Sequence, residues 1–167
     1  MLTTLCRYAK EVWASDSERV DVVIFINGIA IATFELKCNA AGQSVEDAIW
    51  QYRKERNPET RLFMFKSGAL VHFAMDLQEV NMSTHLDGAD TFFLPFNMGA
   101  GEGVNAGKGN PVLKDDYSVS YMWEIILAKD SLIELVSKFI FLEVKTEKDE
   151  VTGKSRTKEN LIFPRFH

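Results

Sequence analysis

Residues 21–37, DVVIFINGIAIATFELK, constrain the fold of this chain more than any other stretch. Two apolar, β-rich runs lie on either side of an Asn-Gly dipeptide at residues 27–28. Asn-Gly between such runs is the strongest short-range signal of a β-hairpin. Asp21 stands at the start of the predicted hairpin, and Glu35 and Lys37 stand at its end. Because an unpaired charge is costly to bury, these three charges at the open end of an apolar hairpin require a chemical explanation.

The size and composition of the chain are those of an ordinary globular protein. Its 167 residues predict a single domain, residues 1–167, with a substantial core. The longest apolar run, residues 22–26, is too short to cross a bilayer, and the N-terminus lacks the features of a secretory signal. Two cysteines, Cys6 and Cys38, cannot form a metal cluster alone. Without a secretion signal we expect reduced thiols and a cytoplasmic protein.

The charge balance excludes one class of function and leaves another open. A net charge of −5 argues against a simple basic module that binds nucleic acid. It does not argue against a DNA-cutting enzyme, because a metal site needs carboxylates and the wider grip on DNA can belong to other subunits. Composition alone therefore does not decide the function.

Hydrophobic spacing and turn residues predict an α/β fold with a mixed central sheet flanked by helices. The clearest helix covers residues 45–56, because Ser44 resembles an N-cap and Asp47 lies at the capping-box position. Residues 96–116 are rich in Gly and Asn and predict an exposed loop, and residues 145–159 predict a charged connector. Further strands are predicted over residues 61–65, 69–75, 79–83, 91–95, 139–144 and 161–163, and further helices over residues 3–13 and 117–138, the latter divided at Asp130-Ser131.

The three hairpin charges suit the hydrolysis of a phosphodiester bond. Glu35 and Lys37 are two residues apart on a predicted strand, so both side chains project from one face. Glu35 can hold a divalent metal while Lys37 reaches the attacking water or the scissile phosphate. Asp21 supplies a second carboxylate and the Leu36 carbonyl a further ligand, a set that suits Mg²⁺. The metal polarises the phosphate and lowers the pKa of its water, and Lys37 adds positive charge where negative charge develops.

This interpretation sets a condition on the register of the hairpin. A strict two-residue turn at residues 27–28 would place Asp21 opposite Phe34, on the other face of the sheet from Glu35. We therefore predict a bulge at residues 26–28, with Gly28 in the left-handed conformation, so that the two acids share a face.

Simpler interpretations of these residues remain open. Acid-x-Lys spacing alone is more often a solvated surface ion pair than a catalytic pair. Gln51, on the predicted helix, could orient the attacking water or contact DNA, or it could be an ordinary polar residue. Arg53, Lys54 and Arg56 on the same helix could meet DNA phosphates, or they could form a solvated helix face. The run GEGVNAGKG at residues 101–109 departs from a phosphate-binding loop at its key positions and predicts a plain loop.

Separated blocks of the sequence resemble, in order, the endonuclease subunit of type I restriction-modification enzymes: RVDVVIFINGIAIATFELK, SVEDAIWQYRKERNPETRLFMFKSGALVHFAMD, FFLPFNMG and TKENLIFPRFH. The resemblance implies a PD-(D/E)xK restriction-endonuclease-like core at the N-terminal end of a large motor subunit. Asp21 matches the first acid of the family. Glu35 and Lys37 match its acid-x-Lys pair, and Gln51 matches the glutamine of the next motif. Many members carry a tyrosine four residues after that glutamine, where this chain has Glu55.

The resemblance implies a Mg²⁺-dependent endonuclease domain that hydrolyses phosphodiester bonds of duplex DNA non-specifically, after ATP-driven translocation by the motor. ATP would bind only to that motor, which would begin just beyond residue 167. The expected partners are double-stranded DNA and the methyltransferase and specificity subunits, with no membrane. The alternative is a non-catalytic domain of the same fold that docks the subunit onto its methyltransferase partners. The intact set of Asp21, Glu35 and Lys37 favours the nuclease.

Overall fold

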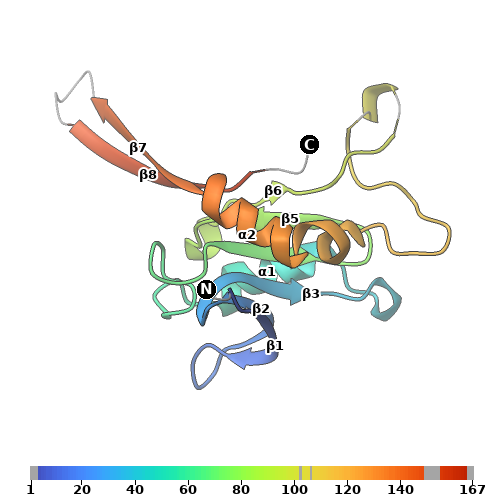
Figure 1. Cartoon of the computed structure of the whole chain (residues 1–167), viewed down its shortest axis with the longest axis horizontal. Helices are drawn as coiled ribbons and strands as arrows, with labels where there is room; N and C mark the ends of the chain where they lie inside the picture. Colours follow the sequence, from blue (N-terminus) through green and yellow to red (C-terminus); the bar gives the residue numbers. More distant parts are fainter. Residues whose placement is uncertain (1–3, 102, 106, 149–154, 165–167) are drawn as a thin grey trace.

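The computed structural model describes residues 4–101, 103–105, 107–148 and 155–164. A six-stranded sheet forms its centre, with the strand order β1-β2-β3-β4-β5-β6 (Figure 1). Neighbouring strands pair antiparallel except β3 and β4, which are parallel and are connected through helix α1. The elements of this part are β1 Cys6–Trp13, β2 Arg19–Ile26, β3 Ile29–Leu36, α1 Val45–Glu55, β4 Val71–Met75, β5 Val80–Ser83 and β6 Leu94–Pro95.

Each face of the sheet has its own apolar core. Helix α1 covers one face with the buried side chains of Val45, Ala48 and Tyr52. A short π-helical stretch, η4 Met122–Ile126, and helix α2, Lys129–Lys138, cover the other face. Figure 1 shows α1 and α2 on opposite sides of the sheet. The predicted α/β class, with a mixed central sheet flanked by helices, is confirmed.

A separate two-stranded sheet follows α2 and consists of β7, Phe141–Lys148, and β8, Ser155–Ile162. This hairpin extends away from the rest of the domain (Figure 1). The connector predicted over residues 145–159 is wrong where it is described, because residues 145–148 and 155–159 continue these two strands. Backbone pairing over the full length of both strands holds this charged segment in a hairpin, in which Lys145 and Lys158 are exposed.

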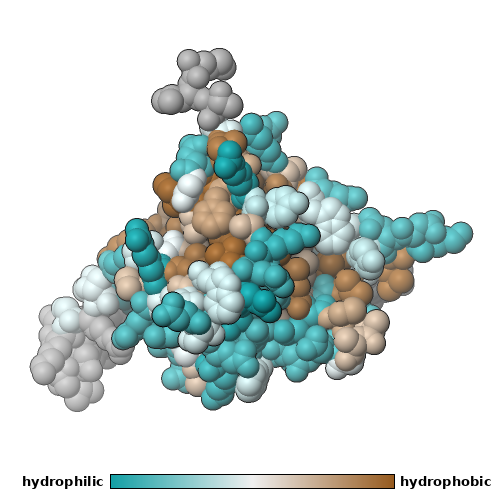
Figure 2. All heavy atoms as spheres, turned by 90° about the horizontal axis from the view of Figure 1, so that it is seen from below, coloured by the Kyte–Doolittle hydropathy of each residue, from teal (hydrophilic) through white to brown (hydrophobic). Residues whose placement is uncertain are grey.

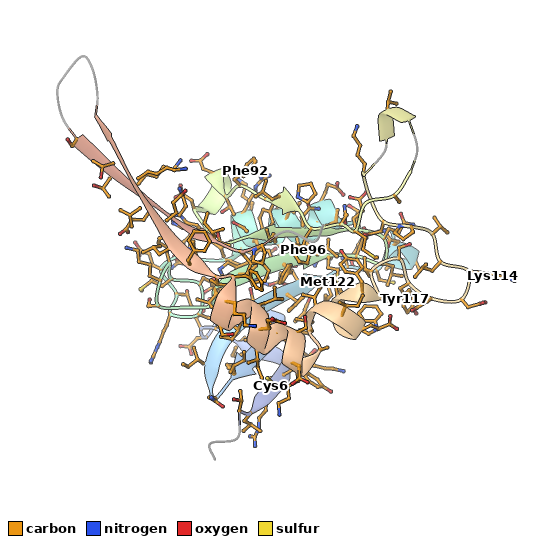
Figure 3. All side chains as sticks on the ribbon, turned by 45° about the horizontal axis from the view of Figure 1, so that its top comes forward. Cys6, Phe92, Phe96, Lys114, Tyr117 and Met122 are labelled. Carbon is orange, nitrogen blue, oxygen red and sulfur yellow. The ribbon has the colours of Figure 1, made fainter. Side chains whose placement is uncertain are left out.

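Phe73 of β4 lies at the centre of the larger core. Its ring is stacked on Phe34 at a centroid distance of 5.0 Å, and it meets Phe96 edge-on at 5.3 Å. Phe163, directly after β8, completes the cluster at 5.9 Å from Phe73. Figure 3 shows Phe96 inside the domain, whereas Phe92 lies at its periphery and is 71% exposed. Residues far apart in the sequence thus meet in one core.

Helix α1 begins and ends close to its predicted limits. The Asp47 carboxylate accepts a hydrogen bond from the Ser44 amide at 2.8 Å, as in a capping box. Strands β4, β5 and β6 fall within the predicted ranges. The described residues of the loop over 96–116 form a bridge between Ala100 and Lys108 and a 3₁₀ turn, with no helix or longer strand among them. The helical region after it is divided at residues 127–128, not at 130–131.

The helix predicted over residues 3–13 is wrong, because this segment forms β1 and pairs antiparallel with β2. As an edge strand, β1 leaves Tyr8 and Trp13 67% and 64% exposed. Figure 2, seen from the β1 end of the sheet, shows apolar side chains among hydrophilic ones on this face. Pairing with the hairpin outweighs the helical spacing of a few apolar residues, since tertiary context commonly overrides local preference.

The strand predicted over residues 61–65 is also wrong. The amides of Phe63 and Met64 both donate to the Thr60 carbonyl, at 2.8 and 3.0 Å, so the chain turns instead of extending. The turns bury the Phe63 ring against α1, 6.5 Å from the ring of Tyr52. Gly68 permits the chain to fold back, because a Cβ there would lie 2.4 Å from the Leu62 carbonyl oxygen.

Candidate functional site

The hairpin at the centre of the sheet contains a bulge, but not at the predicted position. Asn27 and Gly28 form a two-residue turn, both with positive φ, 51° and 85°, and Ile26 pairs with Ile29. Phe25 then pairs with Ala30, but Ile24 pairs with Ala32, so the register shifts there and Ile31 is the extra residue of β3. Gly28 is left-handed as predicted. The bulge was predicted at residues 26–28 but lies at Ile31 in β3.

This shift sets the relative positions of the two candidate acids. Beyond the bulge Val22 pairs with Phe34, so the same register places Asp21 opposite Glu35 on one face of the sheet. The Asp21 carboxylate accepts a hydrogen bond from the Leu36 amide at 2.8 Å, which draws it against β3. The structure therefore brings Asp21 and Glu35 together, as the nuclease interpretation requires.

Glu35 is fully buried, with a relative exposure of 0%. Its Oε1 atom accepts a hydrogen bond from Arg56 Nε at 2.7 Å. Its Oε2 atom has no hydrogen-bond partner among the described residues. Burial raises the pKa of Glu35 to about 7, the nearby charge of Asp21 adds to this rise, and the charges of Arg56 and Lys37 oppose it. A buried carboxylate with one oxygen unpaired is costly, and this cost is relieved if Oε2 binds a cation.

Lys37 and Gln51 meet beside this pair of acids. Lys37 Nζ donates a hydrogen bond to Gln51 Oε1 at 2.5 Å, so the helix holds the end of the lysine side chain. Both residues line a small polar pocket of about 260 Å³, together with Gln43, Asp47, Trp50 and Glu55. Glu55, which stands at the position of the tyrosine expected from the resemblance, thus lines the same pocket. The structure thus pairs Asp21 with Glu35 and Lys37 with Gln51, and the charge of Lys37 acts on Glu35. Neither acid lines the pocket itself.

The donors at the hairpin fit a magnesium ion. No group of three or more His, Cys, Asp or Glu side chains lies in position to hold a metal among the described residues. Mg²⁺ does not need such a group, because one or two carboxylates with waters and phosphate oxygens are its usual ligands. Asp21 and Glu35 supply two carboxylates on facing strands, and the unpaired Oε2 of Glu35 is a free ligand atom. The residues present therefore suit Mg²⁺ as the resemblance implies.

The three basic residues at the C-terminal end of α1, Arg53, Lys54 and Arg56, differ sharply in their surroundings. Lys54 is exposed. Arg53 donates to the Thr91 carbonyl through Nε at 3.0 Å and Nη2 at 2.8 Å. The side chain of Arg56 is only 4% exposed and is paired with Glu35. The predicted contact of Arg56 with a DNA phosphate does not fit this burial. The sequence indicates only that Glu35, on an apolar strand, needs a cationic partner if it is buried. It does not indicate which residue that partner is.

A second buried polar group lies on the same face of β3. Thr33 Oγ1 is 2.8 Å from the Tyr52 hydroxyl and 2.8 Å from His72 Nδ1. Burial lowers the pKa of His72 to about 3, and the charge of His85 adds to the effect. Burial also raises the pKa of Tyr52 well above its usual value. Both rings are therefore neutral near pH 7 and serve to hold α1 and β4 against the strand of Glu35.

Acidification is expected to destabilise the metal-free chain more than a His72→Asn variant. The folded-state pKa of His72 is about 3, whereas an unfolded histidine titrates at about 6.5. Between these values the unfolded state binds more protons, so stability falls as the pH falls. Between about pH 6.5 and about pH 4.5, the wild-type chain should lose about 2 kcal/mol more of its free energy of unfolding than His72→Asn loses. Urea unfolding of both proteins at each pH measures this difference.

Glu35 acts in the opposite direction in this experiment, because its raised pKa makes the folded state bind the extra proton as the pH falls below about 7. The effect is common to the wild-type chain and the variant, so it cancels when the two are compared. An equal pH dependence of both proteins would show that His72 is accessible to protons in the folded state.

The mixed sheet flanked by helices is compatible with a restriction-endonuclease-like fold. The family described as type I restriction enzyme R protein N terminus matches residues 6–91, more than half of the chain. The chain belongs to this family, which relates it to the nucleases of type I restriction. The match contains both acids, the lysine and the glutamine of the candidate site. It begins at residue 6, before the first of the resembling blocks, which begins at residue 19. The resembling blocks at residues 92–99 and 157–167 lie beyond it.

No curated protein and no solved structure matches the chain. None of the helices in the described part of the chain is long and apolar enough to cross a membrane.

Proposed function

We propose that this domain is the Mg²⁺-dependent endonuclease of a type I restriction enzyme. It hydrolyses phosphodiester bonds of duplex DNA without recognising the DNA sequence. One observation carries the proposal: the buried Glu35 has an unpaired Oε2 atom, lies opposite Asp21 and is followed two residues later by Lys37. A surface ion pair does not account for this arrangement, because Glu35 is buried and its cation partner is Arg56 and not Lys37.

Each residue of the site has a distinct role in this proposal. Asp21 and Glu35 hold Mg²⁺, which supplies polarisation of the scissile phosphate and a water of lowered pKa. Lys37 presents its ammonium group to the negative charge that develops on the phosphate. Gln51 fixes Lys37 Nζ through its Oε1 atom, and its amide nitrogen remains available to a phosphate oxygen or to the attacking water.

The wider grip on DNA must come largely from elsewhere in the complex. The net charge of −5 is unfavourable for binding a polyanion. Lys54 is exposed on α1, about one helical turn from Gln51, so it can add a local phosphate contact. We propose that the motor of the full subunit binds ATP and delivers the DNA, and that the specificity and methyltransferase subunits recognise and modify it in the cytoplasm.

In the intact restriction complex, replacing Lys37 by methionine is expected to reduce DNA cleavage about a hundredfold or more, because a preorganised cation opposite the developing charge is lost. ATP hydrolysis should stay at the wild-type rate, since the motor is untouched. Cleavage of plasmid DNA and release of phosphate are measured in parallel. Lys10→Met, an exposed lysine on β1, is the matched control and should cleave normally. Normal cleavage by the Lys37 variant would contradict the proposal and favour a docking role for the domain.

A further inference from the structure

Arg56 is the cation that faces the buried acid of the candidate site. It lies directly after α1, and its side chain is 4% exposed. Nε donates to Glu35 Oε1 at 2.7 Å. Nη2 donates to the Arg19 carbonyl at 3.0 Å, and Nη1 lies 3.3 Å from the Glu55 carbonyl. The planar guanidinium is thus held on three sides, and its position is fixed.

These contacts join the strands that carry the two acids. Arg19 belongs to β2, two residues before Asp21, and Glu35 belongs to β3. On the other side of the pair, the Asp21 carboxylate accepts a hydrogen bond from the Leu36 amide and so links the same two strands. The acids are therefore enclosed between two cross-links, one through Arg56 and one through the Asp21 side chain itself.

The pairing also distinguishes the two oxygens of Glu35. Arg56 occupies Oε1, whereas Oε2 is buried without a partner in the described part of the chain. A purely structural ion pair between an arginine and a carboxylate is commonly bidentate and uses both oxygens. Here the fork is turned so that its other nitrogens bind backbone carbonyls of Arg19 and Glu55. One oxygen of the carboxylate is left for another ligand.

We propose that Arg56 is a positioning residue of the nuclease: it holds Oε1 of Glu35 so that Oε2 faces Asp21 as a metal ligand. This inference rests on the proposed function. Outer hydrogen-bond partners of metal ligands commonly change metal affinity by about 10- to 100-fold when they are removed, because they fix the orientation of the ligand. Arg56 contacts no reacting atom in this scheme and acts only through Glu35.

The test measures the metal directly, without DNA or nucleotide. Mn²⁺ is titrated into the intact R protein and the signal of free Mn²⁺ is followed by electron paramagnetic resonance. The buffer is held well above pH 7, because burial raises the pKa of Glu35 to about 7 even with Arg56 in place, and removal of Arg56 raises that pKa further. An Asp21→Asn variant gives the background from other sites. Folding of each variant is checked by circular dichroism at the same temperature.

Arg56→Met is expected to raise the Mn²⁺ dissociation constant of the site about tenfold or more. Arg56→Lys keeps the charge but lacks the guanidinium fork that joins Glu35 to the Arg19 and Glu55 carbonyls, and it should weaken binding by a smaller factor. Glu18→Gln is the matched control. Glu18 is also buried at this corner, where it accepts hydrogen bonds from Asn57 and Thr60, but it does not bind Glu35. This control should lose stability and keep its metal affinity.

The outcomes separate the inference from the function on which it rests. If the wild-type protein and Asp21→Asn bind Mn²⁺ equally, the metal site itself is absent and the proposed function fails. If Asp21→Asn loses a site that both Arg56 variants keep at wild-type affinity, only the role of Arg56 is overturned. If Glu18→Gln weakens binding as much as Arg56→Met, Arg56 acts through general stability and the inference is also overturned.

Discussion

Replacing Glu35 by glutamine is expected to abolish DNA cleavage by the intact complex, a loss of about a thousandfold or more. The physical reason is that metal polarisation of the phosphate contributes several kcal/mol to the transition state, and each 1.36 kcal/mol changes the rate about tenfold. The substitution removes the charge that binds the metal but keeps the shape of the side chain. The amide oxygen can still accept the hydrogen bond from Arg56 that Glu35 Oε1 accepts at 2.7 Å.

Cleavage is measured on plasmid DNA with ATP hydrolysis recorded in parallel, so that a failure of assembly is recognised. Glu18→Gln is again the matched control, because Glu18 is a buried carboxylate at the same end of the sheet and is 7% exposed. It should cut DNA at close to the wild-type rate. Efficient cleavage by Glu35→Gln would place the metal elsewhere and remove the basis of the proposed function.

The largest expected effect on stability comes from Phe73. Replacing it by alanine should lower the free energy of unfolding of the 167-residue chain by about 3–5 kcal/mol, the usual range for a buried phenylalanine. The Phe73 side chain is 1% exposed, and its ring contacts three others, Phe34, Phe96 and Phe163. Urea unfolding followed by circular dichroism measures the change.

Phe92→Ala is the matched control for this prediction, since the Phe92 side chain is 71% exposed and the same atoms are removed. Its effect should stay within about 0.5 kcal/mol, as for surface substitutions generally. A small effect at Phe73 would mean that the aromatic cluster of Phe34, Phe96 and Phe163 does not pack around Phe73 in solution. The single domain predicted over residues 1–167 would then need to be reconsidered.

Local signals in the sequence were sufficient for the elements with strong turn or cap residues. Asn27-Gly28 marked the hairpin, and Ser44 and Asp47 marked the start of α1. The sequence failed where tertiary pairing decides, as in β1, because an edge strand shows little alternation and a few apolar residues can match a helical period by chance. The bulge was inferred correctly from chemistry but misplaced. Ile31 is β-branched and carries no local mark of an extra residue.

The relative placement of the candidate residues, as distinct from their proposed roles, was predictable where they lie on regular elements. Two-residue spacing on β3 placed Glu35 and Lys37 on one face, and the position of Gln51 on α1 brought it to Lys37. The surroundings of Glu35 were not predictable, because they depend on how α1 ends against the sheet. Arg56 was interpreted as one of three similar basic residues, and only the fold separates it from Arg53 and Lys54.

The bulge at Ile31 has a consequence for how related sequences are compared. It absorbs one residue between the turn and Glu35, so that Asp21 and Glu35 face each other despite an unfavourable count of residues between them. A relative with one residue fewer in this strand would need no bulge, and its two acids would still oppose each other. The number of residues between the acids is therefore free to vary, and a search that fixes that number would overlook homologous domains with the same geometry.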